Sequence, residues 1–172
     1  MVRLGEAHGG EGLRDLLLAC HARIRKFARL AFTIGARTEL PHDEVRAASA
    51  QCLRYFTEAL PLHVRDEEDS LWPRLAGRSA AVDAALSQMR SQHFGHEAQL
   101  EALTGALLAV QAHPEDPSAR RRLEQCAARL ETDFAAHLTL EETNIFPHID
   151  ALSKKEQAQA VEELRARRRP RA

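Results

Sequence analysis

The sequence has little cysteine, few aromatic residues, almost no net charge and no long hydrophobic run. Its three cysteines, Cys20, Cys52 and Cys126, are far apart and form no C-x-x-C pair, so we interpret them as small, reduced core residues. The formal net charge of −1 gives no overall field that would select nucleic acid or a membrane surface. No apolar run approaches the roughly 18 residues of a membrane span, and MVRLGEAHGG at the N-terminus lacks the basic-then-apolar order of a signal peptide. We therefore expect a cytoplasmic protein that binds neither nucleic acid nor a membrane.

Helical periodicity dominates the chain. Aromatic residues make up 5% of the sequence, while Ala, Leu, Arg and Glu are abundant, which favours helix over strand. Apolar residues recur at steps of three and four in four long segments, roughly residues 11–37, 43–73, 82–110 and 117–147. Long helices joined by short loops are typical of an up-down-up-down four-helix bundle. We predict an all-α fold of that kind.

Glycine and proline indicate where the long helices end or bend. Gly35 and then Pro41 are expected to end the first helix, and Pro61 is expected to kink the second one turn before His63. The Asp-Pro pair at 116–117 is typical of an N-cap followed by a first-turn proline.

The C-terminal part of the chain carries one further helix signal. The stretch SKKE at 153–156 is a capping-box pattern and predicts a short C-terminal helix. The basic tail at 165–172 is expected to be frayed and solvated. We predict a single domain over residues 1–172, with its core at about 11–149.

One eleven-residue motif occurs twice. HVRDEEDSLWP runs from His63 to Pro73, and HLTLEETNIFP runs from His137 to Pro147, 74 positions later (137 − 63). A step of four residues turns a helix by about 400°, so the His and the first Glu of each copy point the same way, about 6 Å apart along the axis. A His nitrogen and a carboxylate oxygen from one helix can then reach one metal ion or two adjacent ions.

Histidine and glutamate occupy positions on all four apolar faces. Burying such side chains unpaired costs several kcal/mol, so their presence on core faces calls for a partner. Residue counts from the loop between the third and fourth helices place His93 level with His137. We interpret the set as metal ligands that can converge in one layer of the bundle: His21, His63, Glu67, His93, His137 and Glu141.

The sequence does not decide which residue of the third helix is the metal ligand. His93 fits the apolar stripe, but His96 and Glu97 are alternatives because each could replace or supplement it. Three acidic residues beside the ligands are expected to hydrogen-bond to them or to face solvent: Asp66, Glu68 and Glu142. Four other histidines are expected at the surface or near a terminus: His8, His42, His113 and His148.

At these residues the sequence resembles the hemerythrin-like, or HHE cation-binding, family. The resemblance is carried by the doubled motif, by LLLACHARIRKF around His21 and by MRSQHFGHEAQL around His93, and it spans about residues 13–149. The i, i+4 His/Glu spacing differs from the i, i+3 Glu/His spacing of ferritin-like carboxylate sites.

The resemblance implies a four-helix bundle that holds two non-haem iron ions with an oxo or hydroxo bridge. It implies that His21 and His93 are the ligands from the first and third helices, that His63 and His137 are terminal ligands, and that Glu67 and Glu141 bridge the two ions. Zinc or manganese would suit the same donors.

The sequence also departs from the oxygen-carrying members of that family. Those proteins look richer in histidine, with a His-x3-His pair in the third helix and a more distant Asp in the fourth. This chain has His93, His96 and Glu97 in the third helix and His137-x3-Glu141 in the fourth. Hard anionic oxygens favour the higher charge of Fe(III), so reversible O2 carriage becomes less expected than sensing, iron handling, or peroxide or NO chemistry.

Three functions follow as hypotheses. The first is a binding module that takes up O2 or senses oxygen, iron or redox state, with an unidentified protein receiving the signal. The second is a di-iron oxidoreductase that acts on O2, peroxide or NO, although no general acid or base stands apart from the ligands. The third is a purely structural helical protein, with or without dimerisation. We favour the first, which is not an enzyme.

Overall fold

The computed structural model describes residues 12–169, and every regular element in this part of the chain is helical. The prediction of an all-α protein is confirmed for these residues. Several predictions concern positions outside them, namely His8, Glu11, residues 170–172 and the N-terminal stretch 1–10. The elements in chain order are α1 (Leu13–Ala36), α2 (His42–Arg54), η1 (Tyr55–Ala59), α3 (Leu60–Arg65), η2 (Asp66–Leu71), α4 (Trp72–Leu75), α5 (Ala80–Ala112), α6 (Pro117–Asn144), η3 (Phe146–Ala151) and α7 (Lys154–Arg167).

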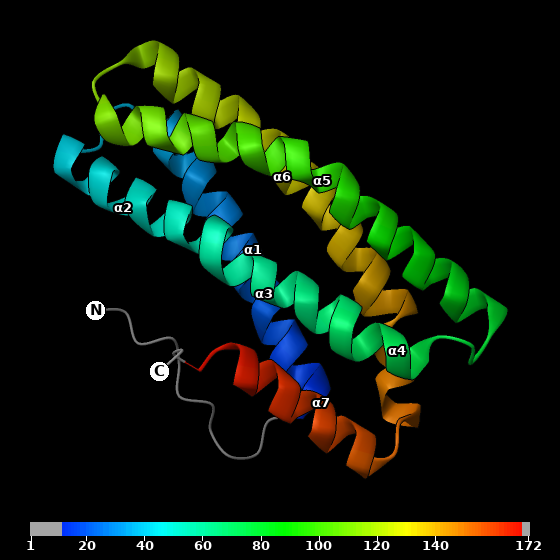
Figure 1. Cartoon of the computed structure of the whole chain (residues 1–172). Helices are drawn as coiled ribbons and strands as arrows, with labels where there is room; N and C mark the ends of the chain where they lie inside the picture. The colour runs from blue at the N-terminus through cyan, green and yellow to red at the C-terminus, as the bar shows by residue number, and fades with distance from the viewer. Residues whose placement is uncertain (1–11, 170–172) are drawn as a thin grey trace.

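Four long helical segments lie along the molecule: α1, the continuous run from α2 to α4, α5 and α6 (Figure 1). α1 packs against α6 and α2, and α5 packs against α6 and α2. Successive segments run in opposite directions along the long axis (Figure 1). Each segment therefore turns one face toward a shared interior.

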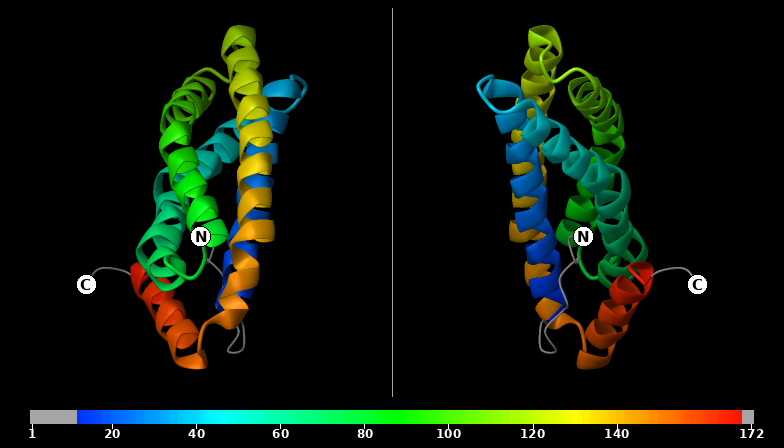
Figure 2. Two further views of the ribbon diagram at one scale, coloured as in Figure 1. Left: turned by 90° about the vertical axis from the view of Figure 1, so that its right-hand side faces the viewer. Right: turned by 90° about the vertical axis from the view of Figure 1, so that its left-hand side faces the viewer.

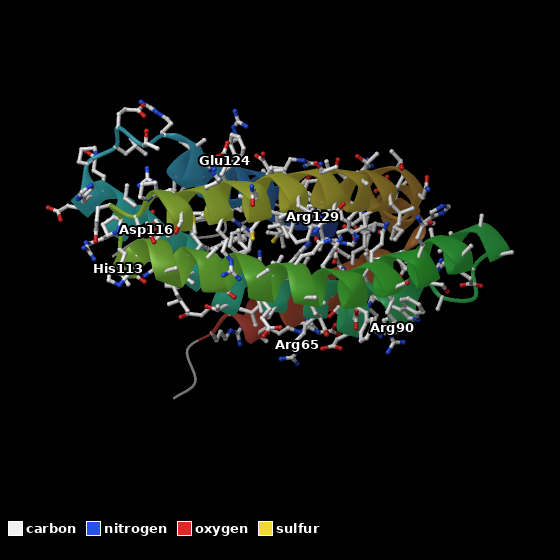
Figure 3. The ribbon with its side chains drawn as sticks, turned by 90° about the horizontal axis from the view of Figure 1, so that it is seen from above. Arg65, Arg90, His113, Asp116, Glu124 and Arg129 are labelled. Atoms are coloured by element: carbon white, nitrogen blue, oxygen red, sulfur yellow. The ribbon has the colours of Figure 1, made fainter. Side chains whose placement is uncertain are left out.

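Two of the predicted helix starts are confirmed in detail. The Asp116 side chain accepts a hydrogen bond from the backbone N–H of Ser118 at 2.8 Å, and Pro117 opens α6. Ser153 and Glu156 form a capping box at the start of α7, in which each side chain accepts from the other residue's backbone N–H, at 3.2 and 2.8 Å. His113 and Asp116 lie at the connection between α5 and α6, at the end of the molecule (Figure 3).

The prolines in the run from α2 to α4 produce wider turns. Here η1 and η2 are π-helical turns, and in them the backbone N–H of Leu60 bonds to Tyr55 and that of Trp72 bonds to Glu67. Pro61 and Pro73 follow immediately, and a proline has no N–H to donate to the preceding turn. A π-helical turn at that point absorbs the missing donor. Pro61 follows one of these turns, and the kink expected there stays a prediction.

The prediction of a frayed, solvated tail is wrong for Arg167 and Arg168, whereas Arg169 is exposed as predicted. Arg165 and Arg167 belong to α7, which lies at one end of the bundle (Figure 2). Arg167 and Arg168 form ion pairs with Asp66, whose side chain is completely buried. The tail is therefore anchored because its charges meet a buried carboxylate. Asp66 neither faces solvent nor contacts the ligands as expected, since it points to α7.

The core consists of two hydrophobic clusters separated by a polar layer. One cluster lies toward the connection between α5 and α6 and includes Ile24, Leu60, Leu103 and Leu130. The other lies toward α7 and includes Leu17, Leu71, Met89, Ile145 and Phe146. Their burial supplies the main driving force for folding, since apolar surface contributes about 25 cal/mol per Å² removed from water. The polar layer lies between the two clusters, and all four helical segments contribute residues to it. Within the described residues no helix is long and apolar enough to cross a bilayer.

Candidate metal centre

The structure brings six of the predicted ligands into the polar layer. α1 contributes His21, α3 contributes His63, η2 contributes Glu67, α5 contributes His93, and α6 contributes His137 and Glu141. The side chains of His21, Glu67 and Glu141 are completely inaccessible to solvent, and those of the other three are no more than 7% exposed. The predicted level of His93 with His137 is confirmed, because their ring centroids are 4.8 Å apart.

The six side chains form two groups that share both carboxylates. One group consists of His21, His63, Glu67 and Glu141, and the other of Glu67, His93, His137 and Glu141, with all ligand atoms of a group within 4.8 Å of one another. Glu67 and Glu141 are called the shared carboxylates below. Each has one oxygen directed to each group.

In the first group, one oxygen of each shared carboxylate lies close to the His21 ring, and the Glu67 oxygen also lies close to the His63 ring. His21 Nε2 lies 3.1 Å from Glu141 Oε2 and 3.6 Å from Glu67 Oε1, and His63 Nε2 lies 3.2 Å from the same Glu67 oxygen. The remaining oxygens face the second group. His93 Nε2 lies 3.3 Å from Glu67 Oε2 and 3.7 Å from Glu141 Oε1, which is 3.1 Å from His137 Nε2.

These distances match those expected between ligand atoms that share one metal ion. Two ligand atoms each about 2.1 Å from one ion are about 3.0 Å apart at a right angle and about 3.4 Å apart at the tetrahedral angle. The facing nitrogens of His21, His63 and His93 and all four shared carboxylate oxygens have no hydrogen-bond partner among the described residues. Buried polar atoms are rarely left unpaired, because each costs about 1–3 kcal/mol. The donor set therefore fits a pair of cations, with two imidazoles and two carboxylate oxygens for each.

Three of the four imidazoles are oriented through their outer nitrogen. His21 Nδ1 lies 2.8 Å from Glu142 Oε1, and His93 Nδ1 lies 2.9 Å from Glu68 Oε1. A carboxylate that accepts from Nδ1–H fixes the ring and leaves Nε2 free to bind a metal. The two predicted acidic neighbours therefore do contact ligands.

The partner of the fourth-helix imidazole was not predicted from the sequence. His137 Nδ1 lies 2.9 Å from Gln92 Oε1, one residue before His93 on α5. The sequence signal for it was weak, since a Gln on a helix can face solvent or any neighbour. His63 Nδ1 is buried and has no partner in the described part of the chain.

The histidines of each group divide into one with a raised and one with a lowered pKa. Burial disfavours the charged form of His21 and of His93, but the shared carboxylates outweigh it and raise the pKa values to about 10 and about 9. Burial lowers the pKa of His63 to about 4 and that of His137 to about 3. Near pH 7 one histidine of each group is therefore a protonated imidazolium and the other is neutral. Each group thus carries one positive charge beside the carboxylates.

The shared carboxylates also have unequal pKa values. Burial, reinforced by the charge of Glu67, raises the pKa of Glu141 to about 8. Burial acts in the same direction on Glu67, but the imidazoles of His63, His21 and His93 outweigh it and lower its pKa below the ordinary range. In the metal-free protein, protons on His21, His93 and Glu141 thus neutralise the negative charge of the polar layer. Bound divalent cations would take over this role.

A small cavity of about 30 Å³ adjoins the polar layer. Its polar lining comes from His63, His93, His96 and His137, and its apolar lining includes Leu60 and Phe134. One water needs about 10–15 Å³ by this kind of measure, so the cavity suits a molecule of two or three atoms. His96 belongs to neither ligand group and packs against the rings of Phe134 and His137, at 4.7 and 5.1 Å between centroids.

The remaining histidine and acidic candidates lie elsewhere. Glu97 is exposed and belongs to neither group. His42, His113 and His148 are exposed, as predicted.

Metal loading is expected to release protons. Metal ions bind the deprotonated ligands, whereas His21, His93 and Glu141, with pKa values of about 10, 9 and 8, are largely protonated at pH 7.5. Adding Zn²⁺ to the stripped protein at that pH should release about two to three protons per chain, and affinity should rise with pH up to about 10. A pH-indicator dye in weakly buffered solution measures the release. Binding of Zn²⁺ without proton release would contradict the charge assignment.

The third-helix assignment predicts unequal effects of two alanine substitutions. Loss of residues that only orient a ligand costs about 10–100-fold in metal affinity, so His93→Ala should cost more than about a hundredfold in its group. His96→Ala should cost less than about tenfold, because His96 contacts His137 without belonging to a group. Competition titrations with a chromophoric chelator give both values. A larger loss for His96→Ala would show that His96 is the ligand.

Comparisons with known proteins agree with this donor set. The chain is 30% identical over 87 residues to an uncharacterized protein of Haemophilus influenzae, an alignment that covers 48% of this chain and 50% of that protein. The chain thus spans about half the length of this relative. The family model described as the hemerythrin HHE cation binding domain matches residues 13–149, which include all six residues of the two groups. The chain therefore belongs to the hemerythrin HHE cation-binding family.

Proposed function

We propose that this protein is a di-iron module that binds O2 or senses oxygen, iron or redox state. In this proposal residues 1–172 form one domain, an up-down-up-down four-helix bundle to which α7 is added. His21 and His63 would hold one iron ion, His93 and His137 would hold the other, and the shared carboxylates would contribute an oxygen to each. When bound, two iron ions would supply Fe(II)/Fe(III) chemistry and a place for a small molecule.

The observation that carries the proposal is the arrangement of buried candidate ligand atoms that have no hydrogen-bond partner within residues 12–169. Each shared carboxylate directs one oxygen to each histidine pair, at 3.1–3.7 Å from the nearest nitrogens. A purely structural layer would pair these atoms with one another, because unpaired burial is costly. Imidazole with carboxylate also suits zinc and manganese, so the choice of iron rests on the resemblance to the hemerythrin-like family.

The cavity supports a small molecule as the ligand. Its volume of about 30 Å³ excludes an organic substrate, and it adjoins rings from both groups. O2, NO or peroxide fits this size. A cytoplasmic location, a homodimer and a protein partner that receives a signal stay predictions of this proposal.

The deciding experiment combines metal content with an optical spectrum. The full chain is loaded with Fe(II) without oxygen, desalted, analysed by mass spectrometry and exposed to air. Two irons per chain with new near-ultraviolet bands are expected, and reversal under argon would identify O2 carriage. One iron or none, without a spectral change, would refute the di-iron proposal.

His96 gives specific support to the oxidoreductase alternative. Its ring lines the cavity, and burial lowers its pKa, so the ring is neutral near pH 7 and can accept a proton from a molecule in the cavity. In that role His96 would exchange a proton with a peroxide or with reduced oxygen in the cavity. A colorimetric assay of peroxide or NO consumption tests it. Turnover no faster than that of free iron would exclude the enzyme.

A further inference from the structure

α7 packs against the turn that carries one of the shared carboxylates. It begins at Lys154, after the stretch that matches the family, so the family match does not account for it. Ala160 and Leu164 dock α7 into the hydrophobic cluster that contains Leu71 and Leu75. The end of α7 is thereby brought to η2, which contains Glu67.

Two arginines connect α7 to the first residue of η2. Arg167 Nη1 donates to Asp66 Oδ1 at 2.9 Å, and Arg168 Nη2 donates to Asp66 Oδ2. Arg167 Nη2 also donates to Ser70 Oγ at 2.7 Å. The side chain of Asp66 is completely buried, and removing one partner of a buried ion pair is strongly destabilising. These contacts therefore hold both ends of the π-helical turn.

A second ion pair joins α7 to α4, the short helix that directly follows η2. Arg74, in α4, donates to both carboxylate oxygens of Glu163 in α7, at 3.0 and 2.7 Å. Arg74 Nη1 also donates to the backbone carbonyl of Ser70 at 2.6 Å. A bidentate pair fixes orientation as well as distance. The connection between α7 and η2 is thus rigid in more than one direction.

The opposite side of η2 faces the metal centre. Glu67, the residue after Asp66, directs its two oxygens to His63 and His93 at 3.2 and 3.3 Å, and Glu68 orients the His93 ring. A rotation of the turn would move both oxygens of Glu67 away from both groups at once. A π-helical turn is less regular than an α-helix, and such turns are frequent at functional sites.

We propose that Arg167, Arg168 and Asp66 are positioning residues that hold Glu67 where it serves both metal ions. This inference rests on the proposed metal-binding function and adds a role for α7. The arginines act through Asp66 and the backbone of η2, without contacting a metal ion.

The test uses Co²⁺ as a spectroscopic probe of the full-length chain. Removing the arginines alone would leave Asp66 charged and unpaired in the interior, so the variant is Asp66→Asn/Arg167→Gln/Arg168→Gln, in which amide groups can pair. Loss of supporting residues typically costs about 10–100-fold in metal affinity. We expect at least tenfold weaker Co²⁺ binding in both groups and a changed ligand-field absorption spectrum. Hydrogen exchange of residues 66–72 should accelerate in the stripped protein.

A matched control removes two charges, one near the end of α7 at Arg165 and one just after it at Arg169. Arg165→Gln/Arg169→Gln alters arginines that pair with Glu162 within α7. Its Co²⁺ affinity should stay within about twofold of the wild type. If the triple variant does not fold, Arg167→Gln alone replaces it, because Arg168 still pairs with Asp66. A folded variant with wild-type affinity and spectrum would overturn the positioning role.

The wild-type titration separates this inference from the proposed function. Two Co²⁺ ions per wild-type chain, with unchanged binding by the folded variant, would refute the role of α7 alone. No Co²⁺ binding by the wild type would refute the metal site and the inference together.

Discussion

Replacing either shared carboxylate by alanine is expected to remove at least one metal ion and to leave the helices folded. Each carboxylate supplies one oxygen to each group, so Glu67→Ala or Glu141→Ala takes one ligand from both. The two hydrophobic clusters on either side of the layer keep their contacts. Without the carboxylate, the imidazoles that faced it can release their protons, so no uncompensated charge stays buried and any loss of stability in the metal-free protein is limited. Metal content after anaerobic Fe(II) loading, with circular dichroism for helix content, measures the result.

Glu97→Ala is the matched control for these two substitutions. Glu97 follows the third-helix ligand by four residues but is exposed and lies outside both groups, so its loss should leave two ions per chain. Normal metal content in both Glu67→Ala and Glu141→Ala would refute the bridging assignment. Metal loss in Glu97→Ala would instead restore Glu97 as a ligand.

Much of this centre could be predicted because helical geometry is local. The step of four residues from His63 to Glu67, and from His137 to Glu141, decides that each pair shares a face. Counting from the loop decided the level of His93, since the rise per residue is nearly constant. The doubled Glu-Glu was informative too, because in each copy the second Glu lies beside an imidazole of another helix, as Glu142 does for His21.

The features that could not be predicted depend on contacts across the fold. Asp66 lies in a run of four acidic residues, which on its own indicates a solvated face. Its partners lie 101 and 102 positions later in the chain, and nothing in the local sequence identifies them. The π-helical turns also depend on competition between proline and the surrounding packing.

Gly35→Ala is expected to destabilise the protein far more than an ordinary glycine substitution in a helix. Gly35 lies near the end of α1, where a Cβ atom would be 2.4 Å from the backbone nitrogen of Glu124 and 2.7 Å from its Cα. Both atoms belong to the backbone of α6, so no side-chain rotation can relieve the clash. Overpacking costs about 1–3 kcal/mol, and we expect about 3 kcal/mol, or a Tm lower by about 6–12 °C. Thermal unfolding measures the change.

Gly105→Ala provides a control with the opposite sign. Gly105 lies within α5, and its added Cβ would meet no atom of the described chain within 4 Å. Alanine is favoured over glycine in a helix by about 0.8–1.0 kcal/mol, so this variant should be more stable than the wild type. Gly35 is 14 residues from His21 (35 − 21), or about 21 Å along α1, so folded Gly35→Ala protein should still bind two metal ions. Equal stability of the two variants would show that α1 and α6 do not approach this closely. If Gly35→Ala loses stability but keeps its full metal content, then Gly35 contributes to the packing of the bundle and not to the metal centre.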